Sequence, residues 1–237
     1  MSPAIAIMQP YLFPYLPYFG LVHNSEEFVF YDDVNYIKGG WINRNRLLVN
    51  GCIKYFSVPL HQASSFRKIC EIETFNFLTF RRKFMNKLAQ NYASAPFRER
   101  GMGYAELVLS SHSGYIAPLA ERSVTAACEI LGLEANFVRS SVDHSSSNGF
   151  SGVERVLRIV KDSFKNAYIN PYGGKSLYSA EAFREAGVEL RFVDPAAEGC
   201  LDANDARPGD LSILHDLFMF SLEELRDQIK QYRVVVA

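Results

Sequence analysis

The stretch AIAIMQPYLFPYLPYFGLVHNSEEFVFYDD, residues 4–33, decides the fold of this chain. Ala4–Met8 and Glu27–Tyr31 are short apolar runs, which are typical of buried strands. Three prolines after the first run favour a shaped loop, at Pro10, Pro14 and Pro17. A short helix over 19–24 would then lead into the second strand. A strand, a helix and a strand within about 30 residues indicate a βαβ unit and therefore a parallel sheet.

Polar side chains follow each of these two expected strands. Gln9 comes directly after the first, and Asp32 and Asp33 come directly after the second. Ligands of open parallel sheets bind beyond the carboxyl ends of the strands, so we expect these residues at a ligand site. If the second strand continues through the aspartates, side-chain alternation sends Asp32 and Asp33 to opposite sides, and only one of them faces the site.

The rest of the chain predicts more helices than strands. Asn50-Gly51 is a turn signal between the runs 47–49 and 53–59, which predicts a hairpin. Apolar residues at helical spacing predict helices over 77–92 and 115–131. Strands are expected over 168–170 and 188–193, and a loop over 195–208. Further helices are expected after a capping box at Ser151, from Ser179 to Ala186 before Gly187, and after caps at Asp210 and Ser221. The economical architecture is an α/β single domain over residues 1–237, with a mostly parallel sheet and a helical insertion at about 76–165.

Composition excludes several classes of protein. The 25 basic and 26 acidic residues nearly cancel, whereas nucleic-acid binders show a basic excess, so no nucleic-acid partner is expected. The cysteines form no CxxC pair and the histidines no HxxxH spacing, so no metal site is predicted. No apolar run approaches the roughly 18 residues of a membrane span, and residues 1–19 lack the basic start of a signal peptide. We therefore expect no membrane insertion and a cytoplasmic location.

The densest group of chemically useful side chains lies in DDVNYIKGGWINRNR, residues 32–46. Its two carboxylates could accept a proton or bind a metal, and Lys38 and Arg44 could hold phosphate or carboxylate oxygens. Trp41 and the Gly-Gly pair before it favour a functional segment over a plain linker. A solvated connection after a strand is the alternative, because aspartate is common in turns.

A second glycine pair lies in Asn170-Pro171-Tyr172-Gly173-Gly174-Lys175-Ser176. The segment is not a Walker A loop, because Ile169 stands where that motif needs its first glycine. Backbone N–H groups freed by glycines could still bind an anion, which would make Asn170, Gly173 and Gly174 ligand-binding residues. A plain turn is the alternative.

Two further features have both a structural and a functional interpretation. Aromatic side chains concentrate between Met8 and Trp41, where they could form part of the core or the wall of a ligand pocket. The expected helix over 77–92 carries a basic face that is either solvated or attracts an acidic partner, and this face consists of Arg81, Arg82, Lys83 and Lys87.

The motifs Gln9-Pro10-Tyr11-x-x-Pro14-Tyr15-x-x-Tyr18-Phe19 and Trp41-x-Asn43-Arg44-Asn45 resemble those of the WbqC-like family. The resemblance continues at Phe28–Asp33, Lys38, Tyr55–Pro59, Tyr92-x-x-Ala95-Pro96 and Leu211–Leu214, and so covers nearly the whole chain. Met8 and Pro17 depart from the histidine and the glycine of many members. The resemblance implies a place in bacterial surface-glycan gene clusters of the O-antigen type, which make unusual N-acylated or aminoacylated sugars.

The residues and the resemblance together favour a transferase that modifies an amino-sugar precursor, carried on a nucleotide, by N-acyl or aminoacyl transfer. Its co-substrate would be an acyl-CoA, an acyl carrier or an aminoacyl donor. Asp32 or Asp33 would act as base, and Lys38 and Arg44 would hold anionic oxygens. The remaining substrate contacts would come from orienting amides (Gln9, Asn43 and Asn45) and from stacking rings (Tyr11, Tyr15 and Trp41).

Two other functions remain open from the sequence. One is an ATP-dependent amide ligase or nucleotidyl-transfer enzyme, in which the acidic pair would hold Mg²⁺. The other is a non-catalytic protein that binds a nucleotide sugar. In each case we expect one shared cleft, lined by Gln9, Asp32, Lys38, Arg44 and Asn170.

Overall fold

The computed structural model describes residues 3–194 and 211–237. Its main sheet has six strands in the order β5-β2-β1-β6-β7-β8. The strands are β1 (Ala4–Met8), β2 (Glu27–Phe30), β5 (Asn136–Arg139), β6 (Ala167–Pro171), β7 (Glu189–Asp194) and β8 (Arg233–Val236). All pairs are parallel except β7 with β8, which confirms the predicted α/β fold with a mostly parallel sheet.

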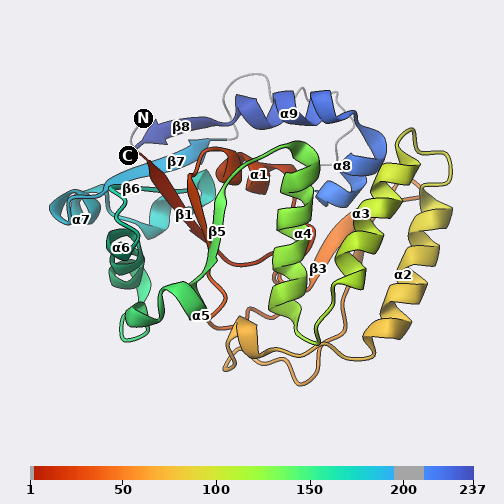
Figure 1. The fold of residues 1–237 in the computed structure, drawn as a ribbon, viewed down its shortest axis with the longest axis horizontal. Helices are drawn as coiled ribbons and strands as arrows, with labels where there is room; N and C mark the ends of the chain where they lie inside the picture. Colours follow the sequence, from red (N-terminus) through yellow and green to blue (C-terminus); the bar gives the residue numbers. More distant parts are fainter. Residues whose placement is uncertain (1–2, 195–210) are drawn as a thin grey trace.

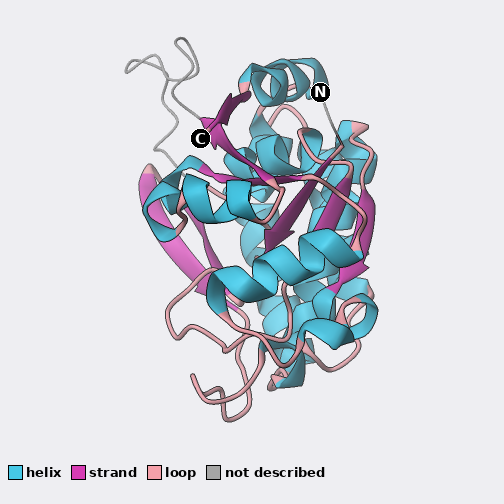
Figure 2. Ribbon diagram, turned by 90° about the vertical axis from the view of Figure 1, so that its left-hand side faces the viewer, coloured by secondary structure: helices cyan, strands magenta, loops and turns pink. Residues whose placement is uncertain are grey.

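Helices cover both faces of this sheet (Figures 1 and 2). On one face lie α6 (Gly152–Asp162) and α7 (Ala180–Glu185). On the other lie α1 (Leu16–His23), α4 (Ile116–Leu131), α8 (Ile213–Met219) and α9 (Leu222–Gln231). Side-chain alternation along β1 supplies both cores, because Ala4 and Ala6 join the larger cluster while Ile5 and Ile7 join the cluster under α6 and α7. The small alanines face the helix-rich side.

A two-stranded antiparallel hairpin, β3 (Arg44–Val49) and β4 (Cys52–Ser57), lies apart from the main sheet. Asn50 and Gly51 both have positive φ, as the predicted turn requires. The first strand begins at Arg44 rather than at Leu47, so Arg44 and Asn45 belong to a strand and not to the loop before it. The hairpin packs beside α2 (Phe77–Asn91), which is followed by α3 (Arg98–Ser110).

The segment 76–165 is not helical throughout. It contains α2, α3, α4 and α6, but β5 inside it forms the edge strand of the main sheet next to β2. Short helical turns follow β5, namely α5 (Ser140–Asp143) and the 3₁₀ turn Ser145–Ser147. The strand has only four residues, which is too short for its alternation to stand out in the sequence.

The start of one helix and the cap of another differ from the sequence prediction. Helix α1 begins at Leu16 and includes Pro17 in its first turn, where the missing N–H of proline costs nothing. Ser151 makes no side-chain capping bond to α6, whereas the predicted capping box at Ser221 is present. Ser212 caps α8; the expected loop over 195–208 and the expected cap at Asp210 lie outside the described residues.

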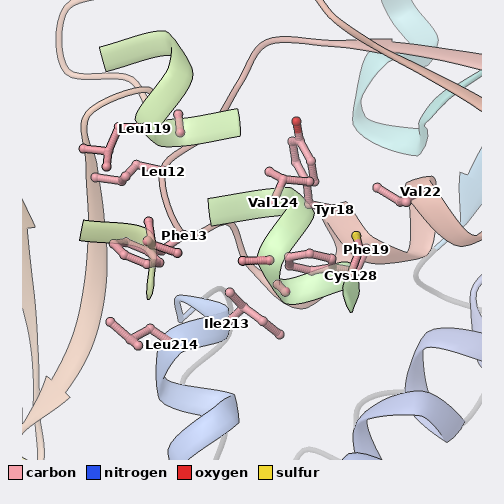
Figure 3. Close-up of a cluster of buried hydrophobic side chains, with 14 of the residues drawn as sticks. Leu12, Phe13, Tyr18, Phe19, Val22, Leu119, Val124, Cys128, Ile213 and Leu214 are labelled. Atoms are coloured by element: carbon pink, nitrogen blue, oxygen red, sulfur yellow. The ribbon is translucent and has the colours of Figure 1, made fainter. Parts of the chain in front are cut away.

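The aromatic N-terminal segment is mostly core. Phe13, Tyr18 and Phe19 are at most 2% exposed, and Figure 3 shows them among side chains of α4 and α8. Phe13 has φ +47°, so a strained loop residue is held in place by burial. No helix in the two described ranges is long and apolar enough to cross a membrane.

Candidate functional site

Three neighbouring strands, β2, β1 and β6, end side by side at one edge of the sheet. The backbone N–H of Tyr31 donates to the carbonyl of Met8 over 2.8 Å, which ties the end of β2 to the end of β1. Gln9 follows β1, the acidic pair follows β2, and Asn170 is the second-last residue of β6. This edge is where open parallel sheets place their ligands.

The two aspartates are buried in a network of hydrogen bonds, with exposures of 2% for Asp32 and 5% for Asp33. Asp32 accepts from the hydroxyls of Ser140 and Ser141 and from the Ser141 backbone N–H. Asp33 accepts from the Ser140 hydroxyl and forms an ion pair of 2.5 Å with the buried Arg155 of α6. We call Asp32, Asp33, Ser140, Ser141 and Arg155 the acidic network.

The expectation that the two aspartates face opposite sides is wrong. Strand β2 ends at Phe30 and the chain turns, so both carboxylates reach the same Ser140 hydroxyl. Each carboxylate already accepts two or more hydrogen bonds from protein donors. The network thereby fastens α5 and α6 to the end of β2. Among the described residues, no group of three or more His, Cys, Asp or Glu side chains is placed to share a metal ion.

Asn170 differs from the aspartates because its side-chain amide has no hydrogen-bond partner among the described residues and still reaches solvent. The residue is 7% exposed, and its side chain makes no hydrogen bond within residues 3–194 and 211–237. It lies against the turn that follows β6: a Cβ atom at Gly174 would stand 2.4 Å from the Asn170 Nδ2 atom. Gly174 therefore leaves room for this amide, whereas Gly173 is exposed and has open space around it.

The loop after β1 is held by polar groups from three distant segments. Asn45 donates to the carbonyls of Leu12 and Phe13 and accepts from the backbone N–H of Arg46. The hydroxyl of Ser123 accepts from the Phe13 N–H, and that of Ser212 donates to the Phe13 carbonyl. Because its amide is fully used and 2% exposed, Asn45 shapes the loop and offers no group to a substrate, contrary to the expectation.

Around this loop the other expected contacts are partly exposed. Gln9 accepts at its backbone carbonyl from the Tyr18 hydroxyl, which leaves its side-chain amide outside that bond. Tyr11 lies 5.7 Å from the Tyr18 ring, and burial raises the pKa of its hydroxyl. Tyr15 precedes α1 and is half-buried.

A second group of predicted residues lies at the start of the hairpin. The Arg44 guanidinium lies over Tyr55 at 4.8 Å and donates to the carbonyls of Gly39 and Gly40. Trp41 stacks on Tyr55 at 6.4 Å and lies under the Arg46 guanidinium at 4.9 Å. We call Trp41, Arg44, Arg46 and Tyr55 the hairpin face.

Two neighbours of the hairpin face have contrasting roles. Lys38 is exposed and has no ion pair in the described part of the chain. The Asn43 amide is occupied, since it accepts from the Tyr36 hydroxyl and donates to the Val58 carbonyl. It therefore braces the loop between Tyr36 and Val58 and, contrary to the expectation, is a poor candidate for orienting a substrate.

Backbone contacts join the two groups of predicted residues. The N–H of Leu12 donates to the carbonyl of Trp41 over 3.0 Å, and Asn45 bonds the same loop. The segment after β1 therefore runs beside the segment that starts the hairpin. A single cleft that also includes Lys38 and Arg44 remains a prediction.

Comparison with known proteins shows the family to which the chain belongs. The family model described as "WbqC-like protein family" matches residues 9–226. The chain belongs to this family. An uncharacterised protein, Rv1507c, of Mycobacterium tuberculosis is 25% identical over 191 residues, which are 80% of this chain and 81% of that protein. No solved structure matches the chain.

The match to the WbqC-like model begins at Gln9 and contains both groups of residues described above. Sequence reasoning missed the partners of the aspartates, above all Arg155. A signal for it exists: Arg155 stands between the apolar positions Val153 and Val156 of an amphipathic helix. A charged residue on the apolar side of a helix needs a buried counter-charge, and the acidic pair supplies one.

Proposed function

We propose that this WbqC-like protein is a transferase that attaches an acyl or aminoacyl group to the amine of a nucleotide-linked amino sugar in surface-glycan biosynthesis. The observation that carries the proposal is the side-chain amide of Asn170, which lies at the carboxyl end of the central strands, reaches solvent and has no hydrogen-bond partner among the described residues. An amide that no protein group occupies can donate to a ligand through its N–H groups and accept through its oxygen. The resemblance to proteins of surface-glycan gene clusters supplies the substrate class.

In this reaction the sugar amine attacks the carbonyl carbon of an activated donor. The C–N bond forms, the carbonyl oxygen becomes an oxyanion, and the bond to the leaving group breaks. The Asn170 Nδ2–H and the Gln9 amide are suited to donate to the oxyanion or to hold the sugar hydroxyls. A leaving thiolate takes up the proton that the amine releases, which balances the step.

Asp32 and Asp33 hold the site in shape in this proposal, in place of the base role that the sequence suggested. Their oxygens already accept protein hydrogen bonds, and Arg155 lies beside Asp33. Taking a proton would break these bonds. The same contacts make the pair a poor Mg²⁺ clamp, because a guanidinium occupies the place where a second cation would bind.

The hairpin face supplies contacts for the nucleotide part of the substrate. Trp41 and Tyr55 present aromatic rings on which a base can stack. Lys38 is exposed near them in the sequence and can hold a phosphate oxygen. The loop contact between Leu12 and Trp41 brings this face next to the loop that starts at Gln9.

A transfer assay tests the proposal. A panel of nucleotide-linked amino sugars is incubated with acyl-CoA and aminoacyl donors, and the product is followed by mass gain and by release of the free thiol. Asn170→Ala should lower turnover by about 10²–10³-fold, the effect of losing one oxyanion donor. Asn166→Ala, which removes an exposed amide just before the same strand, is the matched control and should leave turnover unchanged.

The same assay separates the alternative functions. Turnover should persist in EDTA and without ATP. Loss of activity on chelation with rescue by Mg²⁺ and ATP would favour a ligase, and saturable binding of the sugar without turnover by any donor would favour a binding protein.

A further inference from the structure

A cavity of about 310 Å³ lies between β4 and α2. Its floor consists of Phe84, which is 4% exposed, and Phe56, whose ring lies 4.7 Å from that of Phe84. Phe80 stacks on Phe84 at 5.3 Å and continues the apolar wall. The cavity is therefore open at the surface and apolar at its base.

Two ammonium groups stand at the edge of this cavity. Lys83 and Lys87 are four residues apart on α2, so they lie on the same side of the helix. Both are exposed, and neither has an ion-pair partner in residues 3–194 or 211–237. The other side of this basic stretch is different, because Arg81 pairs with Glu106 of α3.

Three other cavities within the described residues lack this combination. One of about 400 Å³ carries Glu121 and Asp143 together with two arginines, and one of about 580 Å³ combines Arg184 with Glu189. A third, of about 560 Å³, contains Glu73 and no lysine or arginine. The cavity beside α2 has lysines and no acid, so its charge suits an anionic ligand.

The floor of the cavity packs against the loop that belongs to the proposed site. Phe13, in the loop that begins at Gln9, contacts the rings of Phe56 at 6.1 Å and Phe84 at 6.4 Å. Tyr55 at its edge carries the Arg44 guanidinium on its ring. A ligand in the cavity would thus lie behind the loop that follows β1.

We propose that this cavity binds the apolar arm of a phosphate-bearing acyl donor of the acyl-CoA class, with Lys83 and Lys87 holding its phosphates. The inference rests on the proposed function, since acyl transfer is the reaction that needs such a donor. The apolar floor suits the acyl chain, and each buried methylene should tighten binding about fourfold. The unpaired lysines suit phosphate oxygens, because an ammonium group attracts phosphate as a point charge.

Calorimetric titration of the whole protein with octanoyl-CoA, CoA, octanoate and ATP tests this proposal. Octanoyl-CoA should bind at least about tenfold more tightly than each of the other three ligands. Equal binding of CoA and octanoyl-CoA would overturn the role of the cavity, and equal binding of octanoate would overturn the role of the lysines. Tighter binding of ATP than of octanoyl-CoA, or no binding at all, would also overturn the proposal.

Two variants divide the ligand into its parts. The double variant Lys83→Ser with Lys87→Ser should weaken octanoyl-CoA and CoA at least about tenfold. Thr79→Trp, which fills the cavity from an exposed position, should reduce octanoyl-CoA binding to the level of CoA. The matched control, Arg82→Ser with Lys161→Ser, removes two exposed charges that do not line the cavity and should bind like the wild type.

The result is independent of turnover. Unchanged binding by both cavity variants would overturn the donor site even if the transfer assay succeeds. If transfer fails with every acceptor but octanoyl-CoA still binds in this pattern, the donor site stands and the proposed acceptor chemistry is what falls. Circular dichroism of each variant confirms that it is folded.

Discussion

The acidic network and the hairpin face draw on residues only a few positions apart in the sequence, yet the fold places them in opposite surroundings. The aspartates are buried, and their oxygens are taken by Ser140, Ser141 and Arg155. Trp41 and Arg44 are partly exposed, and their contacts are rings and turn carbonyls. Charged side chains in one polar segment can thus serve the structure at one end and remain accessible to a ligand at the other.

The difference follows from what each segment must satisfy. Buried carboxylates are tolerated only when they are paired and hydrogen-bonded, so the network has to be complete. A guanidinium stacked on an aromatic ring at the surface keeps its charge in water and needs no complete set of partners. Four pairs of substitutions test this contrast, from the largest expected effect to the smallest.

Removing the counter-charge of the acidic network should give the largest loss of stability. Arg155→Leu leaves Asp33 buried without its ion pair, and the free energy of unfolding should fall by about 3–5 kcal/mol. Urea denaturation followed by circular dichroism measures it. The control is Arg158→Leu on the same helix, where the arginine side chain is 48% exposed and pairs with Asp162. Its loss should lower the free energy of unfolding by no more than about 0.5 kcal/mol. Equal losses from both variants would contradict a buried network.

The hairpin face should owe its stability to the core beneath it rather than to its own charges. Phe84→Ala removes a buried ring that contacts Phe13 and Phe56, and should destabilise the protein by about 3–5 kcal/mol in the same assay. Phe66, which is 92% exposed, is the control, and Phe66→Ala should stay within about 0.5 kcal/mol. A small effect of Phe84→Ala would mean that this side of the molecule repacks.

Two neighbours in β3 bring the comparison down to adjacent residues. Asn45→Ala leaves the Leu12 and Phe13 carbonyls without a donor, at a cost of about 1–3 kcal/mol. Arg44→Ala should change stability by no more than about 0.5 kcal/mol and instead abolish binding of the nucleotide sugar. Thermal unfolding and titration of the two variants side by side measure both effects. The contrast fails if Arg44→Ala lowers the melting temperature as much as Asn45→Ala.

A third buried carboxylate, Glu121 on α4, should show the effect of an incomplete set of partners. Its Oε2 atom pairs with Arg139, but its Oε1 atom has no hydrogen-bond partner in the described part of the chain, and burial raises its pKa above 4.5 despite that arginine. The folded state therefore holds the proton more tightly than the unfolded state. Stability should fall as the pH rises from 4.5 through the raised pKa.

Urea denaturation between about pH 4 and 8 measures this pH dependence. Glu121→Gln should flatten the fall, because it removes the titrating group. Glu129→Gln, at a side chain that is 61% exposed, should keep the fall. An unchanged pH profile in Glu121→Gln would show that Arg139 fully compensates the carboxylate.

The parallel sheet, the hairpin and several helices, though not α3, could be predicted from the sequence because their signals are local. The apolar run at Ala4–Met8, the Asn50-Gly51 turn and the apolar spacing of α2 and α4 lie within a few residues of the structure they produce. Family membership was visible for a similar reason, since the Gln9-Pro10-Tyr11 and Trp41-x-Asn43-Arg44-Asn45 motifs are short and specific. The gathering of polar residues at the ends of β1, β2 and β6 follows from strand order.

Only the tertiary structure decided which of those polar residues keep their groups available. Ser140 and Arg155 lie more than 100 positions from the aspartates they bind, and Asn45 bonds to a loop more than 30 positions before it. No local pattern reports such a pairing, because a carboxylate or an amide has the same letter whether its hydrogen bonds go to protein or to a ligand. Burial with a partner makes Asp33 structural, and an amide that has no partner among the described residues makes Asn170 the candidate for binding.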